Sequence, residues 1–281
     1  MVKGLRPADL QEALEFRARH LSIPIAGGTD LMVQRARGFG LKPDFNKPLL
    51  FIGHLRELRQ VSIRDGNIHI GASIFLSELL KNSKIPESLT MAVRQMASPS
   101  SRNLATIGGN ICNASPAGDT LPYLYAVDAI MVLKSNQAER KIPVEKFITG
   151  PGKTTLKSDE LLIEIIIPDK VFSANYYKKV GTRKGMSLSK ASFTGLADLE
   201  NEIINDIRIA FGSVAPTIVR SREIEASIIG QSVLEIKNAV PEILKKYAPL
   251  IQPIDDARSS ATYRKQVSLR LFEDFLRNLA S

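Results

Sequence analysis

Two Gly-Gly pairs, Gly27-Gly28 and Gly108-Gly109, constrain the fold of this chain more than any other feature. The first pair follows an apolar stretch at 23–26 that is typical of a short strand, and it precedes a helical pattern at about 31–37. Adjacent glycines permit positive φ and let another group approach the backbone closely. Consecutive N–H groups in such a turn form a concavity that binds anions. The sequence therefore predicts a strand–turn–helix unit whose turn is either an anion site or an ordinary tight turn with Asp30 as helix cap.

The second pair lies in a stretch rich in Ser, Gly, Asn and Pro that runs from Ser98 to Pro122. We expect this stretch to be a long irregular loop, and such loops inside a compact domain usually serve a function. Two glycine-rich turns far apart in sequence can clamp one diphosphate with backbone amides instead of lysines. Asp119 then suits a donor-rich part of the same ligand. The alternative is a buried polar network of turns with Asp119 as a cap.

The apolar periodicity around these turns predicts an α+β protein with a break near 168–174. Alternation on both sides of Asp65-Gly66 indicates a hairpin at 61–70. Before the break we expect further helices at 6–21, 76–80 and 89–96, and further strands at 49–52, 129–133 and 161–167. After the break we expect strands at 176–180, 192–199 and 207–214, then helices at 221–229, 233–247 and 263–279. Strands followed by helices are typical of an α+β domain.

Composition and missing motifs exclude several classes of function. The net charge of +9 comes from Lys and Arg spread along the chain without interleaved aromatics, so a basic surface is favoured over nucleic-acid binding. The sequence contains no apolar window of about twenty residues, so it predicts no membrane span. Phosphate-binding loops and Rossmann fingerprints are absent, and the three histidines do not pair at metal-ligand spacing. The single cysteine, Cys112, excludes a disulfide framework and favours a reduced, cytoplasmic setting, with Cys112 itself a small apolar filler.

Two segments, Ala26–Leu31 and Ala105–Asp119, resemble the FAD-binding medium subunit of the molybdenum hydroxylases. That family includes xanthine dehydrogenase, carbon monoxide dehydrogenase and aldehyde oxidoreductases. The resemblance continues in Lys179 with Arg183, in Gly212–Arg220 and in Asp256–Arg264. It covers essentially the whole chain, and Ala105–Asp119 is its most specific part.

This resemblance implies a fold and a cofactor. The implied fold is α+β: a two-lobed FAD-binding domain of the vanillyl-alcohol oxidase/MurB type at 1–170, with lobes at about 1–55 and 56–170, then a small domain of antiparallel sheet and helices at 171–281. FAD lies extended between the lobes in that fold. The residues implied to line it are Ile25, Ala26, Gly27, Gly28, Thr29, Asp30, Leu31, Ala105, Thr106, Gly109, Asn110, Cys112, Asn113, Gly118, Asp119, Leu162 and Lys179. A plain core position for Leu162 and a surface salt bridge for Lys179 fit the sequence equally well.

The function implied by the resemblance is electron transfer within a complex. A large subunit oxidises a small substrate at a molybdenum-pterin cofactor. The range of substrates in the family suggests that this substrate is an aldehyde. The [2Fe–2S] clusters of a small subunit pass electrons to this FAD, which serves an external acceptor. We therefore expect no catalytic residue and no metal ligand in this chain, and a heterotrimer or its dimer as the assembly. Two alternatives stay open: a self-sufficient FAD-dependent oxidoreductase on the same fold, and a non-enzymatic interaction protein whose glycine turns are purely structural.

Overall fold

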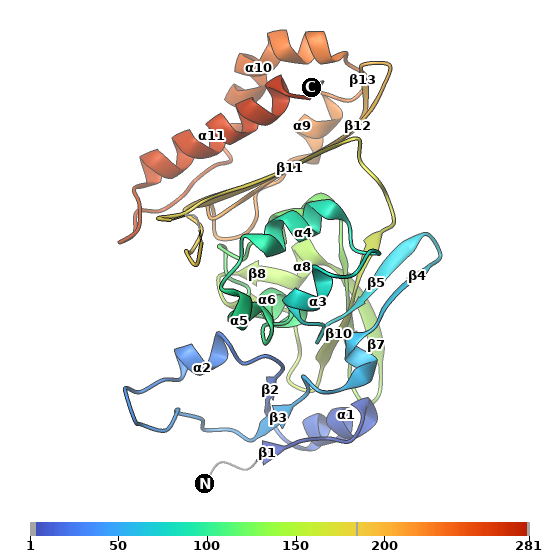
Figure 1. Ribbon diagram of the computed structural model, residues 1–281, viewed down its shortest axis with the longest axis vertical. Helices are drawn as coiled ribbons and strands as arrows, with labels where there is room; N and C mark the ends of the chain where they lie inside the picture. The colour runs from blue at the N-terminus through green and yellow to red at the C-terminus, as the bar shows by residue number, and fades with distance from the viewer. Residues whose placement is uncertain (1–3, 184, 280–281) are drawn as a thin grey trace. The chain divides into compact units, whose positions relative to one another are not determined.

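The computed structural model describes residues 4–183 and 185–279, which form two compact units. The first unit runs to Ile85 and adds Ala97–Ala114 and Ala129–Asp169. The second unit comprises Pro86–Met96, Ser115–Asp128 and the chain from Lys170 onward. Figure 1 shows the elements of each unit in chain order. The division at 170 stays a prediction, and the structure adds that two earlier segments pack with the C-terminal part.

The first unit opens with a small parallel sheet and one helix. Strands β1 (Gly4–Leu5), β3 (Leu49–Phe51) and β2 (Ile23–Ile25) lie in that order, and both pairings are parallel. Helix α1 (Leu10–Arg19) starts where the Asp9 side chain accepts a hydrogen bond from the Glu12 backbone N–H, at 2.8 Å. Its Leu14 packs with Leu50 of β3 in one buried cluster. The predicted strand–turn–helix–strand unit is confirmed, with α2 (Leu31–Gln34) shorter than predicted.

A five-stranded antiparallel sheet forms the rest of the first unit. Its order is β4 (Val61–Arg64), β5 (Asn67–Gly71), β10 (Leu161–Pro168), β6 (Ile130–Lys134) and β7 (Glu139–Pro143). The predicted hairpin is confirmed, and its turn residues Asp65 and Gly66 have φ of 51° and 68°. The sequence did not predict β7, nor the short elements η1 (Arg56–Arg59), α8 (Val144–Phe147), β8 (Ile148–Gly150) and β9 (Lys153–Thr154).

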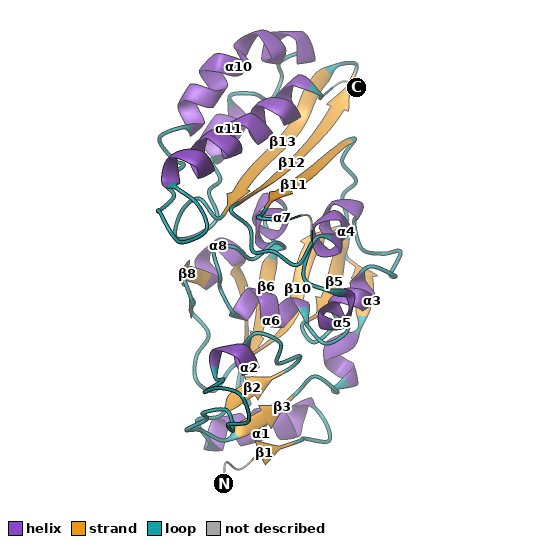
Figure 2. Ribbon diagram, turned by 60° about the vertical axis from the view of Figure 1, so that its left-hand side comes forward, coloured by secondary structure: helices purple, strands orange, loops and turns teal. Residues whose placement is uncertain are grey.

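Short helices accompany this sheet where the sequence predicted a loop. Helices α3 (Leu76–Leu79), α5 (Pro99–Arg102) and α6 (Ile107–Cys112) belong to the first unit, and Figure 2 shows α6 in front of the sheet. The prediction of an irregular loop from Ser98 to Pro122 was therefore wrong. Because glycine has low helix propensity, Gly108 and Gly109 did not indicate a helix at α6. That helix forms because Thr106 caps its first turn and Ile107 and Ile111 are buried.

The second unit is a three-stranded antiparallel sheet between two groups of helices. Strands β11 (Ala174–Val180), β12 (Ala191–Glu200) and β13 (Ile203–Gly212) pair in chain order. The helices are α4 (Glu87–Arg94), α7 (Leu121–Ala126), α9 (Arg222–Ala226), α10 (Val233–Tyr247) and α11 (Ala261–Arg277). Gly195 of β12 admits α11, since a Cβ there would lie 2.7 Å from the Phe275 ring. The predicted strands-then-helices pattern is confirmed, and the overall α+β class with it.

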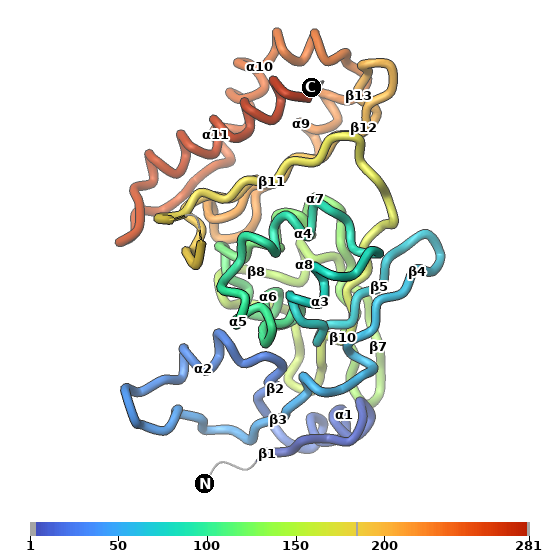
Figure 3. Tube along the Cα trace, in the orientation of Figure 1, coloured from blue at the N-terminus to red at the C-terminus, as the bar shows by residue number. Residues whose placement is uncertain are grey.

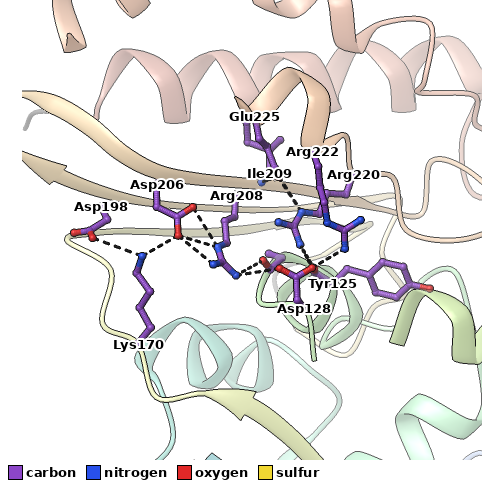
Figure 4. Close-up of polar contacts among 11 residues, drawn as sticks. Tyr125, Asp128, Lys170, Asp198, Asp206, Arg208, Ile209, Arg220, Arg222 and Glu225 are labelled. Carbon is purple, nitrogen blue, oxygen red and sulfur yellow. Dashed lines mark hydrogen bonds and ion pairs between the residues drawn. The ribbon is translucent and has the colours of Figure 1, made fainter. Parts of the chain in front are cut away.

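A charge network joins Ser115–Asp128 to the C-terminal part, in addition to the buried side chains of α7. Asp128, just after α7, accepts hydrogen bonds from Arg220 at 2.8 Å and Arg222 at 2.6 Å, and from Arg208 of β13 at 3.3 Å (Figure 4). Arg220 also pairs with the buried Glu225 at 3.0 Å. One carboxylate thus ties the end of α7 to three guanidinium groups of this unit.

Candidate cofactor-binding site

The first glycine turn is held against the second glycine-rich segment. A Cβ added to Gly27 would lie 2.0 Å from the carbonyl oxygen of Leu104, so only glycine permits this approach. Gly28 has φ of +70°, a left-handed conformation that favours glycine. The two segments, far apart in sequence, therefore meet within the first unit.

Side chains add a second connection between the two segments. Asn113, just after α6, donates from its amide nitrogen to the Asp30 carboxylate and accepts from Gln34 Nε2 at 2.9 Å. Asp30 occupies the N-cap position of α2, as the alternative interpretation expected, but its side chain makes no capping bond to the helix. Its carboxylate orients Asn113 instead.

The first turn presents a row of backbone donors without protein acceptors. The first N–H that the turn uses internally is that of Met32, which donates to the Gly28 carbonyl at 2.9 Å. Among residues 4–183 and 185–279, no protein acceptor faces the N–H groups of Gly27, Gly28, Thr29, Asp30 and Leu31. Successive free N–H groups at a glycine turn leading into a helix form a site for an anion. We call residues 27–31 the amide nest.

The second glycine turn contributes differently. The N–H of Gly108 donates to Ala72 O at 2.8 Å, and that of Gly109 donates to Thr106 Oγ1 at 3.1 Å. A Cβ on Gly108 would lie 2.6 Å from Ala72 O, whereas one on Gly109 would meet only Thr106 Oγ1, at 3.0 Å. Free amides were expected from both turns, but only the first has them. Gly108 allows α6 to pack closely against Ala72, whereas Gly109 lies on the exposed face of α6.

A hollow borders the nest on the side of β2. It measures about 340 Å³ and is lined mainly by apolar groups, and Arg6 and Arg59 are among its lining residues. Arg59 lies over the Phe75 ring at 4.4 Å. Gly27 of the nest lines this hollow, together with Ile25 and Ala26, which precede it in the chain.

Cys112 behaves as an inert thiol. Its removal from water raises the pKa of Cys112 to about 12, and the charge of Arg17 opposes this only in part. The thiol is therefore protonated at neutral pH, as the interpretation of an apolar filler requires. The guanidinium of Arg17 is itself buried and donates to Glu160 O at 2.6 Å and Ser22 O at 2.7 Å.

The remaining predicted residues are placed as follows. Ala105 is half-buried and accepts from Leu76 N at 2.9 Å, and Asn110 lies half-buried in α6. Leu162 is buried in β10 opposite Leu133, as in an ordinary core strand. Gly118, Asp119 and Lys179 belong to the second unit.

Asp119 and Lys179 form a buried ion pair in the second unit. Lys179 Nζ lies 2.6 Å from Asp119, and both side chains are less than a tenth exposed. The alternative of a surface salt bridge for Lys179 was therefore wrong. Ser189 Oγ donates to the same carboxylate at 2.5 Å, and Tyr177 donates at 3.2 Å. Burial raises the pKa of Asp119, while Lys179, Ser189 and Tyr177 oppose that rise.

No sequence pattern pointed to Tyr177 or Ser189 as partners of Asp119. Strand β11 carries Tyr177 and Lys179 two residues apart, which places both side chains on one face. Ser189 precedes β12, the neighbouring strand. Only the strand pairing brings these donors to one carboxylate.

Two further features concern metals and membranes. Throughout the described part of the chain, no cluster of three or more His, Cys, Asp or Glu side chains could hold a metal ion. In that same part, no helix has both the length and the apolar character needed to cross a bilayer.

Comparisons with known sequences identify both parts of the chain. Residues 1–170 match the family described as "FAD binding domain in molybdopterin dehydrogenase". Residues 175–279 match "CO dehydrogenase flavoprotein C-terminal domain". The glyceraldehyde dehydrogenase medium chain of Sulfolobus acidocaldarius is 33% identical over 94% of this chain and 92% of its own length. The xanthine dehydrogenase FAD-binding subunit of Escherichia coli O157:H7 is 30% identical over 98% of this chain and 94% of its own.

Solved structures show the same fold. A chain of carbon monoxide dehydrogenase from Hydrogenophaga pseudoflava superposes with a TM-score of 0.87 at 25% identity, covering 98% of this chain and 96% of that one. Quinoline 2-oxidoreductase from Pseudomonas putida 86 gives 0.85 at 18% identity over 99% of this chain and 96% of that one, which shows the fold alone.

Proposed function

Because this chain belongs to the family of FAD-binding medium subunits of molybdenum hydroxylases, we propose that it relays electrons through FAD between partner subunits and an external acceptor. The FAD-binding domain and the oxidoreductase class follow from the family. The direction of electron flow, the partners and the substrate are the proposed part.

The observation that carries the proposal is the amide nest. FAD contains a diphosphate, and five successive N–H groups without protein acceptors match a group that carries two adjacent anionic centres. Each charge-assisted hydrogen bond of this kind contributes about 1.5–3 kcal/mol. The residues present therefore fit the cofactor that the family implies.

We assign a separate task to each part of the first unit. The N–H groups of Gly27–Leu31 bind the diphosphate, and the adjoining hollow leaves room for a nucleoside portion. Asn113, fixed by Asp30 and Gln34, holds the second segment in register with the nest. Gly109 keeps the exposed end of α6 open to the ligand. When bound, FAD supplies the redox chemistry, and the protein binds and orients it.

The second-unit residues stay predictions drawn from the resemblance. Asp119 and Lys179 offer a carboxylate and an ammonium held rigidly by Tyr177 and Ser189. Such a buried pair suits the polar ribityl or ring portion of a flavin. Gly118 and Leu162 carry no further support beyond their positions in the sequence.

The proposed complex contains a large subunit with a molybdenum-pterin cofactor and a small subunit with [2Fe–2S] clusters, in a heterotrimer or its dimer. An aldehyde is the proposed substrate, and the similarity to a glyceraldehyde dehydrogenase medium chain supports it. A self-sufficient FAD-dependent oxidoreductase is the competing function, without a specific observation in its favour.

Purification of the native complex tests this function. The complex is isolated through a tag on this chain, and FAD, molybdenum, iron and the co-purifying chains are quantified. We expect one FAD per copy of this chain together with molybdenum and iron in two other chains. Full substrate turnover by the isolated chain with FAD, without those metals, would instead establish the self-sufficient enzyme.

A further inference from the structure

An exposed arm connects the amide nest to β3 in the first unit. It comprises residues 32–47, and Figure 3 shows it leaving α2 and returning to the sheet. The arm carries four exposed apolar side chains, with Phe39 fully exposed: Met32, Val33, Phe39 and Leu41. Exposing a large aromatic side chain forgoes about 1.5–3 kcal/mol of burial. Several such side chains on one short arm mark an interaction surface.

The tip of the arm has a defined conformation. Asp44 N–H donates to Arg35 O at 2.9 Å and closes the loop, and Leu41 N–H donates to Gly38 O at 3.3 Å. The glycines on either side of Phe39, Gly38 and Gly40, have φ of +139° and +74°. These conformations disfavour other residues, so the Gly-Phe-Gly tip is built to present its aromatic side chain.

The arm is also basic. It contains four basic residues and one acidic residue: Arg35, Arg37, Lys42, Lys47 and Asp44. In the described ranges 4–183 and 185–279, Arg35, Arg37 and Lys42 form no ion pair, and all three are exposed. Phe, Met and Arg are the residue types enriched at the centres of protein interfaces.

We propose that the arm docks a partner subunit through an apolar pocket with an acidic rim, Phe39 filling the pocket. Charge complementarity argues for this occupant, because carboxylates on the partner compensate the arm's cations when docking removes water from them. Two copies of the same arm would set like charges against each other, which disfavours self-association through it. The identity of the partner as an electron-transfer subunit rests on the proposed function.

The position of the arm suits that partner. It continues directly from the nest through α2, where Gln34 is bonded to Asn113 of the second segment. Docking here places the partner beside the proposed diphosphate site.

The test uses the native complex with Phe39→Asp and the double variant Arg35→Glu/Arg37→Glu. Ile254→Asp and Arg270→Glu are matched controls, because both residues are exposed and belong to the second unit. We expect each arm variant to lower the partner chains retained per tagged chain by about tenfold or more, the effect of losing an interface hot spot. The controls should retain them. Undiminished retention in Phe39→Asp would overturn the proposal.

A zero-length carbodiimide cross-linker identifies the occupant in the wild-type complex. It joins amines to carboxylates in contact, so we expect Lys42 cross-linked to an Asp or Glu of a partner chain. Lys42 cross-linked to a second copy of this chain would overturn the proposal, as would arm-dependent binding to anionic phosphatidylserine vesicles with no cross-link. FAD content of the isolated chain is measured in parallel: its absence defeats the proposed function, whereas intact FAD without the cross-link defeats only the docking surface.

Discussion

Gly27 lies so close to Leu104 that a Cβ on Gly27 would fall 2.0 Å from the Leu104 carbonyl oxygen. This contact joins two segments far apart in sequence and fixes where the amide nest faces. Because one added methyl group at Gly27 would disrupt this contact, a substitution at Gly27 tests the site directly.

Gly27→Ala should separate the nest from the second segment. The added methyl group overlaps backbone, which cannot rotate away, so we expect a loss of about 1–3 kcal/mol in the free energy of unfolding and a lower FAD content. Chemical denaturation and flavin absorbance measure the two effects. Gly150→Ala, at a glycine of the same unit with open space around it, is the control and should change neither quantity. Equal behaviour of the two variants would contradict the close approach.

Gly109→Val should abolish cofactor binding while the fold persists. The Cβ of the new side chain would meet only Thr106 Oγ1, and residue 109 lies on the exposed face of α6. We expect an unfolding free energy within about 1 kcal/mol of the wild-type value, since the higher helix propensity of valine offsets the tight contact with Thr106 Oγ1, and little bound FAD. Gly109→Ala separates size from helix propensity and should retain more FAD than Gly109→Val. A full complement of FAD in the valine variant would remove Gly109 from the site.

Lys179→Met should leave the Asp119 carboxylate buried without its cation. Removing one partner of a buried pair costs about 3–5 kcal/mol at neutral pH. Burial already holds the folded-state pKa of Asp119 above its ordinary value, and loss of the ammonium raises this pKa further. The neutral carboxyl is therefore favoured in the folded state at low pH, and this contribution is lost as pH rises through the folded-state pKa.

Unfolding free energies between about pH 4 and pH 8 test this prediction. The deficit of Lys179→Met should shrink toward pH 4, and Lys179→Met/Asp119→Asn should remove its pH dependence. A deficit that does not vary with pH would show that Asp119 stays ionised and solvated.

Cys112 should resist thiol reagents in the folded protein. With its pKa raised to about 12, almost none of the thiolate exists at pH 8. We expect native-state alkylation at pH 8 to be much slower than that of the unfolded chain, which the single cysteine lets one follow by mass spectrometry. Rapid labelling at pH 8 under native conditions would show a solvated thiol.

The parts of the fold that sequence predicted are those with strong local signals. Helix α10 was predicted with its observed bounds from its apolar periodicity, and the structure adds a capping box formed by Ser232 and Glu235. The hairpin at Asp65-Gly66 was predicted from the apolar alternation on both sides of its turn. Helix α6 was missed because glycines conceal a helix whose stability comes from a cap and two buried isoleucines.

The geometry of the site depends on contacts that no local pattern encodes. The sequence indicated that both glycine turns matter, but not that Gly108 packs on Ala72 while Gly27 packs on Leu104. Tyr177 and Ser189 reach Asp119 only through strand pairing. Residue types predicted the ligand class, and the tertiary contacts decide which backbone donors are free.

The central claim is that the amide nest of Gly27–Leu31 binds the diphosphate of FAD. Calorimetric titration of the cofactor-free chain with FAD and with riboflavin, which has the same ring but no phosphate, tests it most directly. We predict one FAD per chain, bound about a hundredfold or more tightly than riboflavin, since several charge-assisted hydrogen bonds are lost with the phosphates. Equal affinities for the two ligands would contradict the account.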